Sequence, residues 1–119
     1  MSLFMMNAIY NTQRQLQTHT LNDTFTFDID STLSIPEAVQ KMYSENEYTF
    51  SILYSQDEKA FEFDENGEQR IPKDVYDGLI KQKTDESWGG LCVYNGQTCL
   101  PQYIKKDENI IIALFAFYL

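Results

Sequence analysis

Two cysteines and one histidine are the residues that could supply nucleophilic chemistry. Cys92 and Cys99 flank Asn95-Gly96, and a tight turn at that dipeptide would place the two thiols face to face, near enough for a disulfide. A cysteine nucleophile also needs a base, and His19 is the single imidazole of the chain. His19 lies in a segment whose pattern defines no clear element. We therefore favour two reduced thiols on a sheet face and predict no catalytic residue.

The sequence gives little support for a metal-binding site. Two cysteines and one histidine cannot form a zinc site of ordinary spacing. The run from Glu62 to Gly67 imitates the first half of a calcium loop, but Lys73 stands where the last ligand should be Glu. Asp28 and Asp30 share one face of a predicted strand, which a solvated surface explains better than a bound cation. We predict no metal and no cofactor.

Trp88 precedes Gly89-Gly90, and this loop has two interpretations. The sequence lacks the Lys and Ser or Thr that would make the glycines a phosphate loop. A tryptophan beside glycines is typical of a recognition tip, because Trp is enriched at interface hot spots. The alternative is a Trp folded back over the core.

The elements that must position these residues begin with strands of period two. Apolar and polar residues alternate over residues 24–30, 48–55 and 60–64. This alternation predicts strands with one buried and one solvated face. Residues 3–10 and 12–20 could also be strands, although the second also fits a poor helix.

Two helices are predicted. Ser34 and Glu37 form a capping box around an early proline, followed by an apolar stripe. The second helix starts near Pro72. The stripes consist of Ala38, Val39, Met42 and Tyr43 in the first helix, and of Val75, Tyr76, Leu79 and Ile80 in the second.

The best hairpin signal lies between Leu91 and Leu100. Asn95-Gly96 suits a two-residue type I′ turn, which would pair Tyr94 with Gln97 and Cys92 with Cys99. Pro101 suggests that the second strand is an edge or ends early. After a polar turn, the apolar run 110–118 predicts a strand buried on both faces.

The predicted fold is α+β, with a mainly antiparallel sheet of five to seven strands and two helices on one face, in a single domain of residues 1–119. An internal repeat would divide it into two β-α-β-β units. Phe25-Thr-Phe27-Asp28, then Ile35-Pro36, recurs at an offset of 36 as Phe61-Glu-Phe63-Asp64, then Ile71-Pro72. Convergence on a strand that runs into a Pro-started helix is the alternative.

Charge is the most unusual feature. The net charge is −9, and residues 23–68 contain twelve acidic residues against two basic ones. Such a charge disfavours direct binding to nucleic acid or to an anionic membrane. The sequence begins without a basic, apolar signal segment, and its longest apolar run, 110–119, is about half a membrane span, so we expect a cytoplasmic protein.

Three hypotheses for function follow. The first is an acidic interaction domain that binds and inhibits a basic protein, as immunity proteins and nucleic-acid mimics do. The alternative explanation of the acidity is that it serves only solubility. Its expected contact residues are Asp28, Asp30, Glu62, Asp64, Glu65, Glu68 and Trp88. The second is a small-molecule pocket or a modest enzyme, lined by Phe25, Phe50, Tyr54 and Phe61. The third is a homodimer that forms through the final strand or an open sheet edge.

Overall fold

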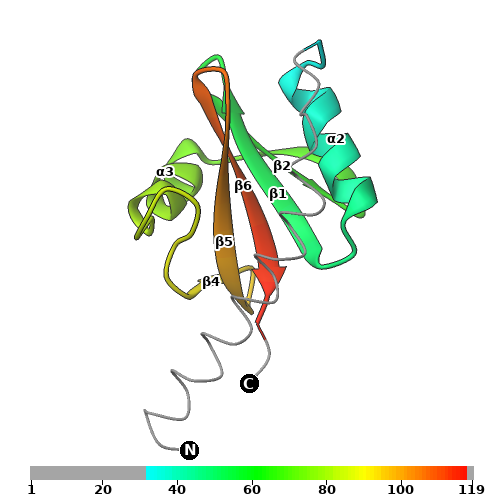
Figure 1. The fold of residues 1–119 in the computed structure, drawn as a ribbon. Coiled ribbons are helices and arrows are strands. Elements are labelled where there is room, and N and C mark those ends of the chain that lie inside the picture. Colours follow the sequence, from blue (N-terminus) through cyan, green and yellow to red (C-terminus); the bar gives the residue numbers. More distant parts are fainter. Residues whose placement is uncertain (1–31, 118–119) are drawn as a thin grey trace, which may run out of the picture.

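A computed structural model of the protein describes residues 32–117, which form two helices and one sheet of six strands (Figure 1). The prediction of an α+β fold with a mainly antiparallel sheet is confirmed. The elements are α2 (Ile35–Glu45), β1 (Thr49–Gln56), β2 (Lys59–Asp64), β3 (Gly67–Ile71), α3 (Lys73–Lys81), β4 (Cys92–Tyr94), β5 (Gln97–Lys106) and β6 (Asn109–Ala116).

The sheet joins two antiparallel meanders. Its strand order is β3-β2-β1-β6-β5-β4, so each meander keeps the order of the chain and the two meet where β1 pairs with β6. Ile111 to Phe115 of β6 are fully buried, as the apolar run predicted. Because β6 has a neighbour on each side, it is a central strand, and β3 and β4 are the edges of the sheet.

The two helices cover opposite faces of the sheet, so the prediction of both helices on one face is not confirmed (Figure 1). Successive residues of a strand point to opposite faces. Ile52 of β1 packs in one cluster with Val39 of α2, whereas the adjacent Leu53 packs in another with Leu79 of α3. We call these faces the α2 face and the α3 face. A central strand buried on both sides requires cover on both sides.

Helix α2 begins as its sequence predicts. The backbone N–H of Glu37 donates to Ser34 Oγ over 3.3 Å, and the backbone N–H of Ser34 donates to Glu37 Oε1 over 3.1 Å. Hydrogen bonding by the Ser34 side chain, and then by the Ser34 backbone N–H, lowers the pKa of the Glu37 carboxyl. The predicted stripe packs on the sheet, with Ala38, Val39 and Met42 buried.

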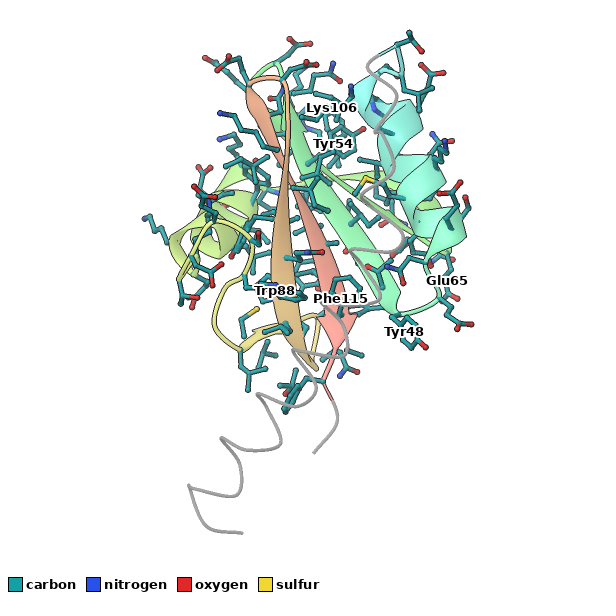
Figure 2. The ribbon with its side chains drawn as sticks, in the orientation of Figure 1. Tyr48, Tyr54, Glu65, Trp88, Lys106 and Phe115 are labelled. Carbon is teal, nitrogen blue, oxygen red and sulfur yellow. The ribbon has the colours of Figure 1, made fainter. Side chains whose placement is uncertain are left out.

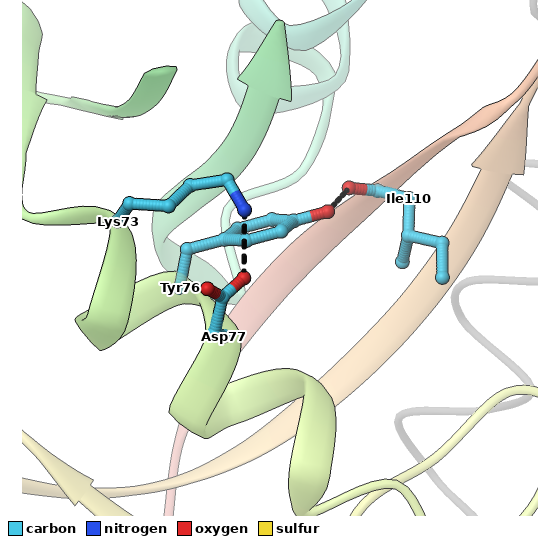
Figure 3. A network of polar contacts seen from close by, with 4 residues as sticks. All are labelled: Lys73, Tyr76, Asp77 and Ile110. Atoms are coloured by element: carbon cyan, nitrogen blue, oxygen red, sulfur yellow. Dashed lines mark hydrogen bonds and ion pairs between the residues drawn. The ribbon is translucent and has the colours of Figure 1, made fainter. Parts of the chain in front are cut away.

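Helix α3 is tied to the sheet by two phenols, since Tyr103 of β5 donates to the backbone carbonyl of Leu79, and Tyr76 makes the second bond (Figure 3). Tyr76 donates to the backbone carbonyl of Ile110 in β6 over 2.8 Å. On the same helix, Lys73 and Asp77 form an ion pair of 2.8 Å, one turn apart. Of the predicted stripe, Tyr76 and Leu79 are buried, while Val75 is exposed.

The β4–β5 hairpin has the predicted register. Tyr94 pairs with Gln97, Cys92 pairs with Cys99, and Asn95 and Gly96 both have positive φ. Pro101 does not end β5, which continues to Lys106, and β4 rather than β5 is the edge. The Pro101 carbonyl accepts from the Gly89 N–H and therefore points away from β6. The Pro101 nitrogen, which has no hydrogen to donate, faces the same way, so the β5–β6 ladder loses no bond.

Strand β3 was not predicted. Its sequence, Gly-Glu-Gln-Arg-Ile, has no apolar alternation. It forms because it pairs with β2 from Ala60 to Asp64 through a tight turn that ends at Gly67, whose φ is +93°. The predicted strand at 24–30, the segment 1–21 and the first copy of the repeat up to Asp28 lie outside the described residues. The repeat therefore stays an interpretation.

Candidate functional site

The predicted contact residues do not share one surface. Asp28 and Asp30 lie outside the described residues. Glu62 pairs with Leu53 and so points to the α3 face, whereas Glu68 pairs with Phe63 on the α2 face. Glu62 and Glu68 therefore lie on opposite faces of the sheet.

Glu62 is buried rather than exposed, with 5% of its surface accessible. Ser51 Oγ donates to Glu62 Oε2 over 2.9 Å. The prediction placed Glu62 on an outward, solvated side of β2. It is wrong because this sheet is covered on both faces, so alternation along β2 does not separate solvent from core.

Tyr94 of β4 lies close to Glu62. Burial raises the pKa of the Tyr94 phenol, and a hydrogen bond to Glu62 with the charge of Asp64 raises it further. Three strands separate β4 from β2 in the sheet order, so this contact means that the sheet curls around the α3 face. We call Ser51, Glu62 and Tyr94 the buried polar cluster.

Glu68 is exposed, but its carboxylate is engaged. The phenol of the buried Tyr54 donates to Glu68 Oε1. Burial and this bond raise the pKa of Tyr54. Glu68 therefore satisfies a core hydroxyl with one of its two carboxylate oxygens.

Trp88 is part of the core, with 3% of its surface accessible, and the recognition-tip prediction is wrong. Its ring lies 6.1 Å from that of Phe115, and its backbone N–H donates to Asp85 Oδ1 over 2.7 Å. The adjacent Tyr103 N–H donates to Ser87, which pulls the loop onto β5. The alternative of a Trp folded over the core is the observed one.

The aromatics proposed to line one pocket lie on different faces. Tyr54 and Phe61 stack on the α2 face with ring centroids 5.2 Å apart. Phe50 packs against the cluster on the α3 face. A register shift between Thr49 and Ser51 interrupts the alternation along β1, which explains the separation. Phe25 and His19 lie outside the described residues.

A different acidic surface forms where α2 ends and β2 turns into β3. The rings of Tyr43 and Phe63 meet edge to face, 5.3 Å apart, and hold the turn against the helix. Burial raises the pKa of Tyr43, and the charges of Glu65 and Asp64 raise it further. Glu65 is exposed and Asp64 half-buried.

Residues that sequence reasoning did not select complete this surface. Glu45 and Glu47 are exposed at the end of α2, and Tyr48 keeps 52% of its surface accessible. Figure 2 labels Tyr48 and Glu65, which lie toward the same end of the sheet in that view. Tyr48 was predicted to be an inward residue of β1, but it precedes the strand, which starts at Thr49. We call Glu45, Glu47, Tyr48, Asp64 and Glu65 the acidic end.

The opposite end carries both charge signs. Asp57 and Glu58 form the β1–β2 turn, and Lys59 begins β2. Asp107 and Glu108 form the β5–β6 turn, and Lys105 and Lys106 end β5. The two turns are neighbours because β1 ends where its partner β6 begins. Segments 44–48 and 63–67, in contrast, contain four acidic residues and no basic one. We call the first region the mixed end.

Among residues 32–117, no group of three or more His, Cys, Asp or Glu side chains is placed to hold a metal ion. In the same range, no helix is long and apolar enough to cross a membrane. Comparisons of the chain with protein-family models, with curated proteins and with solved structures found no match.

Proposed function

We propose that the protein is a cytoplasmic interaction domain that binds a basic partner protein through its acidic end and inhibits it. The observation that carries the proposal is the separation of charge along the molecule. The two segments that form the acidic end contribute four acidic residues and one exposed tyrosine, and they contain no basic residue.

Helix α2 strengthens the negative field at this end. The C-terminus of a helix carries a partial negative charge of about half an elementary charge, which basic residues in the last turn usually offset. The last turn of α2 has no basic residue and ends on Glu45. The dipole and the carboxylates therefore add, at a cost to the helix that a role in binding would explain. Such a field speeds the approach of a basic partner.

Tyr48 can supply the affinity that exposed carboxylates alone do not provide. Exposed carboxylates at the rim of an interface contribute to rate and orientation more than to affinity. A tyrosine can bury a large ring and keep its hydroxyl hydrogen-bonded, which is why it is common at hot spots. With 52% of its surface accessible beside Glu47, Tyr48 is the expected anchor.

Inhibition follows if the partner uses its basic surface for its own ligand, because the acidic end would then cover that surface.

The test is affinity purification from lysate of the source cell with three immobilised proteins: the wild type, an acidic-end variant (Glu47→Lys with Glu65→Lys) and a mixed-end variant (Glu58→Lys with Glu108→Lys). Both variants change the net charge by the same amount at exposed positions. We expect a basic protein that the wild type and the mixed-end variant retain and that the acidic-end variant loses. It should elute at intermediate salt, because salt screens exposed charges.

Two results would contradict the proposal. One is the same set of retained proteins on both variants, since this would mean that net charge alone decides binding. The other is no protein retained above background by the wild type. The effect of the domain on the recovered partner's own activity then tests inhibition separately.

A further inference from the structure

The β4–β5 hairpin brings two thiols together that the proposed interaction does not use. Cys92 and Cys99 face each other in register, with 3.5 Å between their sulfur atoms. Facing residues of antiparallel strands have Cα atoms about 4.5 to 5.5 Å apart. Disulfides span Cα separations of about 4.4 to 6.8 Å, so the backbone already has a suitable separation.

The sulfur atoms need to move only a short way. A disulfide bond is about 2.05 Å long, so the two atoms must approach by roughly 1.5 Å, which small rotations of the two side chains can provide. The thiols lie on the α3 face, where Cys99 packs in the core and Cys92 packs at its margin. The site is therefore built by the hairpin register, which the Asn95-Gly96 turn fixes.

The two thiols differ in exposure and in acidity. Cys92 is half-buried, whereas Cys99 has no accessible surface. The hydrogen bond between them lowers the pKa of Cys92 and raises that of Cys99. An accessible thiol of lowered pKa beside a buried partner is the arrangement of an attacking and a resolving cysteine.

We propose that Cys92 and Cys99 are a reversible disulfide-forming site that exchanges with low-molecular-weight disulfides such as oxidised glutathione. The Cys92 thiolate attacks one sulfur of the glutathione disulfide, which forms a mixed disulfide and releases one glutathione thiolate. Cys99 then loses its proton and attacks Cys92 Sγ, which releases the second glutathione. Two protein thiols are oxidised to one disulfide, and one glutathione disulfide is reduced to two thiols.

The structural effect of the disulfide would be confined to the β4–β5 hairpin. The new bond would close the ring from Cys92 to Cys99 and fasten the three-residue edge strand β4 to β5. Tyr94 would stay within that ring, so its place in the buried polar cluster would become fixed by a covalent bond. The acidic end belongs to other elements, and this inference does not rest on the proposed function.

The test uses the folded full chain in glutathione buffers of graded redox poise, quenched with acid and analysed by intact mass. The wild type should lose the mass of two hydrogen atoms under oxidising conditions and regain it with dithiothreitol. Cys99→Ser should stop at the mixed disulfide and gain one glutathionyl group at Cys92. Cys92→Ser should react far more slowly, because its remaining thiol is buried. Circular dichroism establishes that each variant is folded.

Two outcomes would overturn the inference. In one, the wild type accumulates the glutathionyl adduct and does not resolve it. In the other, the thiols oxidise only after denaturant unfolds the chain. Because both concern the wild type, the test stands even where Cys99→Ser does not fold.

Discussion

Tyr43 and Phe63 meet edge to face with ring centroids 5.3 Å apart and an angle of 79° between their planes. Tyr43 belongs to the last turn of α2, and Phe63 belongs to the end of β2. This contact fixes the turn that carries Glu65 against the end of the helix that carries Glu45. One pair of rings therefore assembles the acidic end from segments that are far apart in the sequence.

This pairing predicts a measurable coupling between the two rings. An edge-to-face pair contributes about 0.5 to 1.5 kcal/mol beyond burial. A double-mutant cycle of Tyr43→Leu and Phe63→Leu, measured by urea unfolding, should give a coupling of about 1 kcal/mol. Additive effects would mean that the rings merely lie near each other.

Glu62 should matter for stability and not for binding. Glu62→Ala leaves the Ser51 hydroxyl and the Tyr94 phenol without their acceptor, and a buried unpaired donor costs about 1 to 3 kcal/mol. Urea unfolding should show a loss of that size, against less than about 0.5 kcal/mol for the exposed Glu47→Ala. Equal effects of the two substitutions would show that Glu62 is not part of a buried cluster.

The buried tyrosines predict a loss of stability at high pH. Burial, as the largest cause, raises the pKa of Tyr54, Tyr76, Tyr94 and Tyr103 above the ordinary 10.0. A raised pKa in the folded state contributes stability that is complete below pH 10.0 and is lost as the pH rises toward the folded pKa, because the unfolded chain releases its protons first.

Unfolding free energies measured between about pH 8 and pH 11 test this sign. The free energies should fall above the ordinary tyrosine pKa, and Tyr76→Phe should reduce the slope of free energy against pH. The lysines titrate in the same range, but this substitution leaves them unchanged. A slope that is independent of this substitution would contradict a raised Tyr76 pKa.

Gly89 is predicted to tolerate no side chain. A Cβ there would lie 2.7 Å from Tyr103 Oη and 2.9 Å from both Gln82 O and Pro101 Cγ. Gly89→Ala should lower the free energy of unfolding by about 1 to 3 kcal/mol. Gly90→Ala is the matched control, because its Cβ would meet nothing within 4 Å. A similar small effect of both would mean that the 87–89 segment is not held against β5.

Local signals in the sequence predicted local structure well. The capping box at Ser34 and Glu37 specifies the start of α2, and Asn95-Gly96 specifies the β4–β5 register, because each depends on bonds between near neighbours. The apolar run of β6 likewise predicted burial on both faces.

Features that depend on distant contacts were not predictable in this way. The burial of Glu62 requires β4 to curl back over β2, and the burial of Trp88 requires its loop to dock on β5. Tyr48 lies outside the core because β1 starts after it and then carries a register shift. Strand β3 forms by pairing alone, without an apolar pattern of its own. The strong acidity was evident in the sequence, but which acidic segments lack a basic residue nearby depends on how the turns are arranged in the fold.

The most direct test of the central claim is the dissociation constant between the domain and the basic partner, measured by calorimetry for the wild type, the acidic-end variant and the mixed-end variant. We predict that the acidic-end variant binds at least about tenfold more weakly, a difference of about 1.4 kcal/mol, while the mixed-end variant stays near the wild type. Equal loss in both variants, or none in either, would contradict a binding surface at the acidic end.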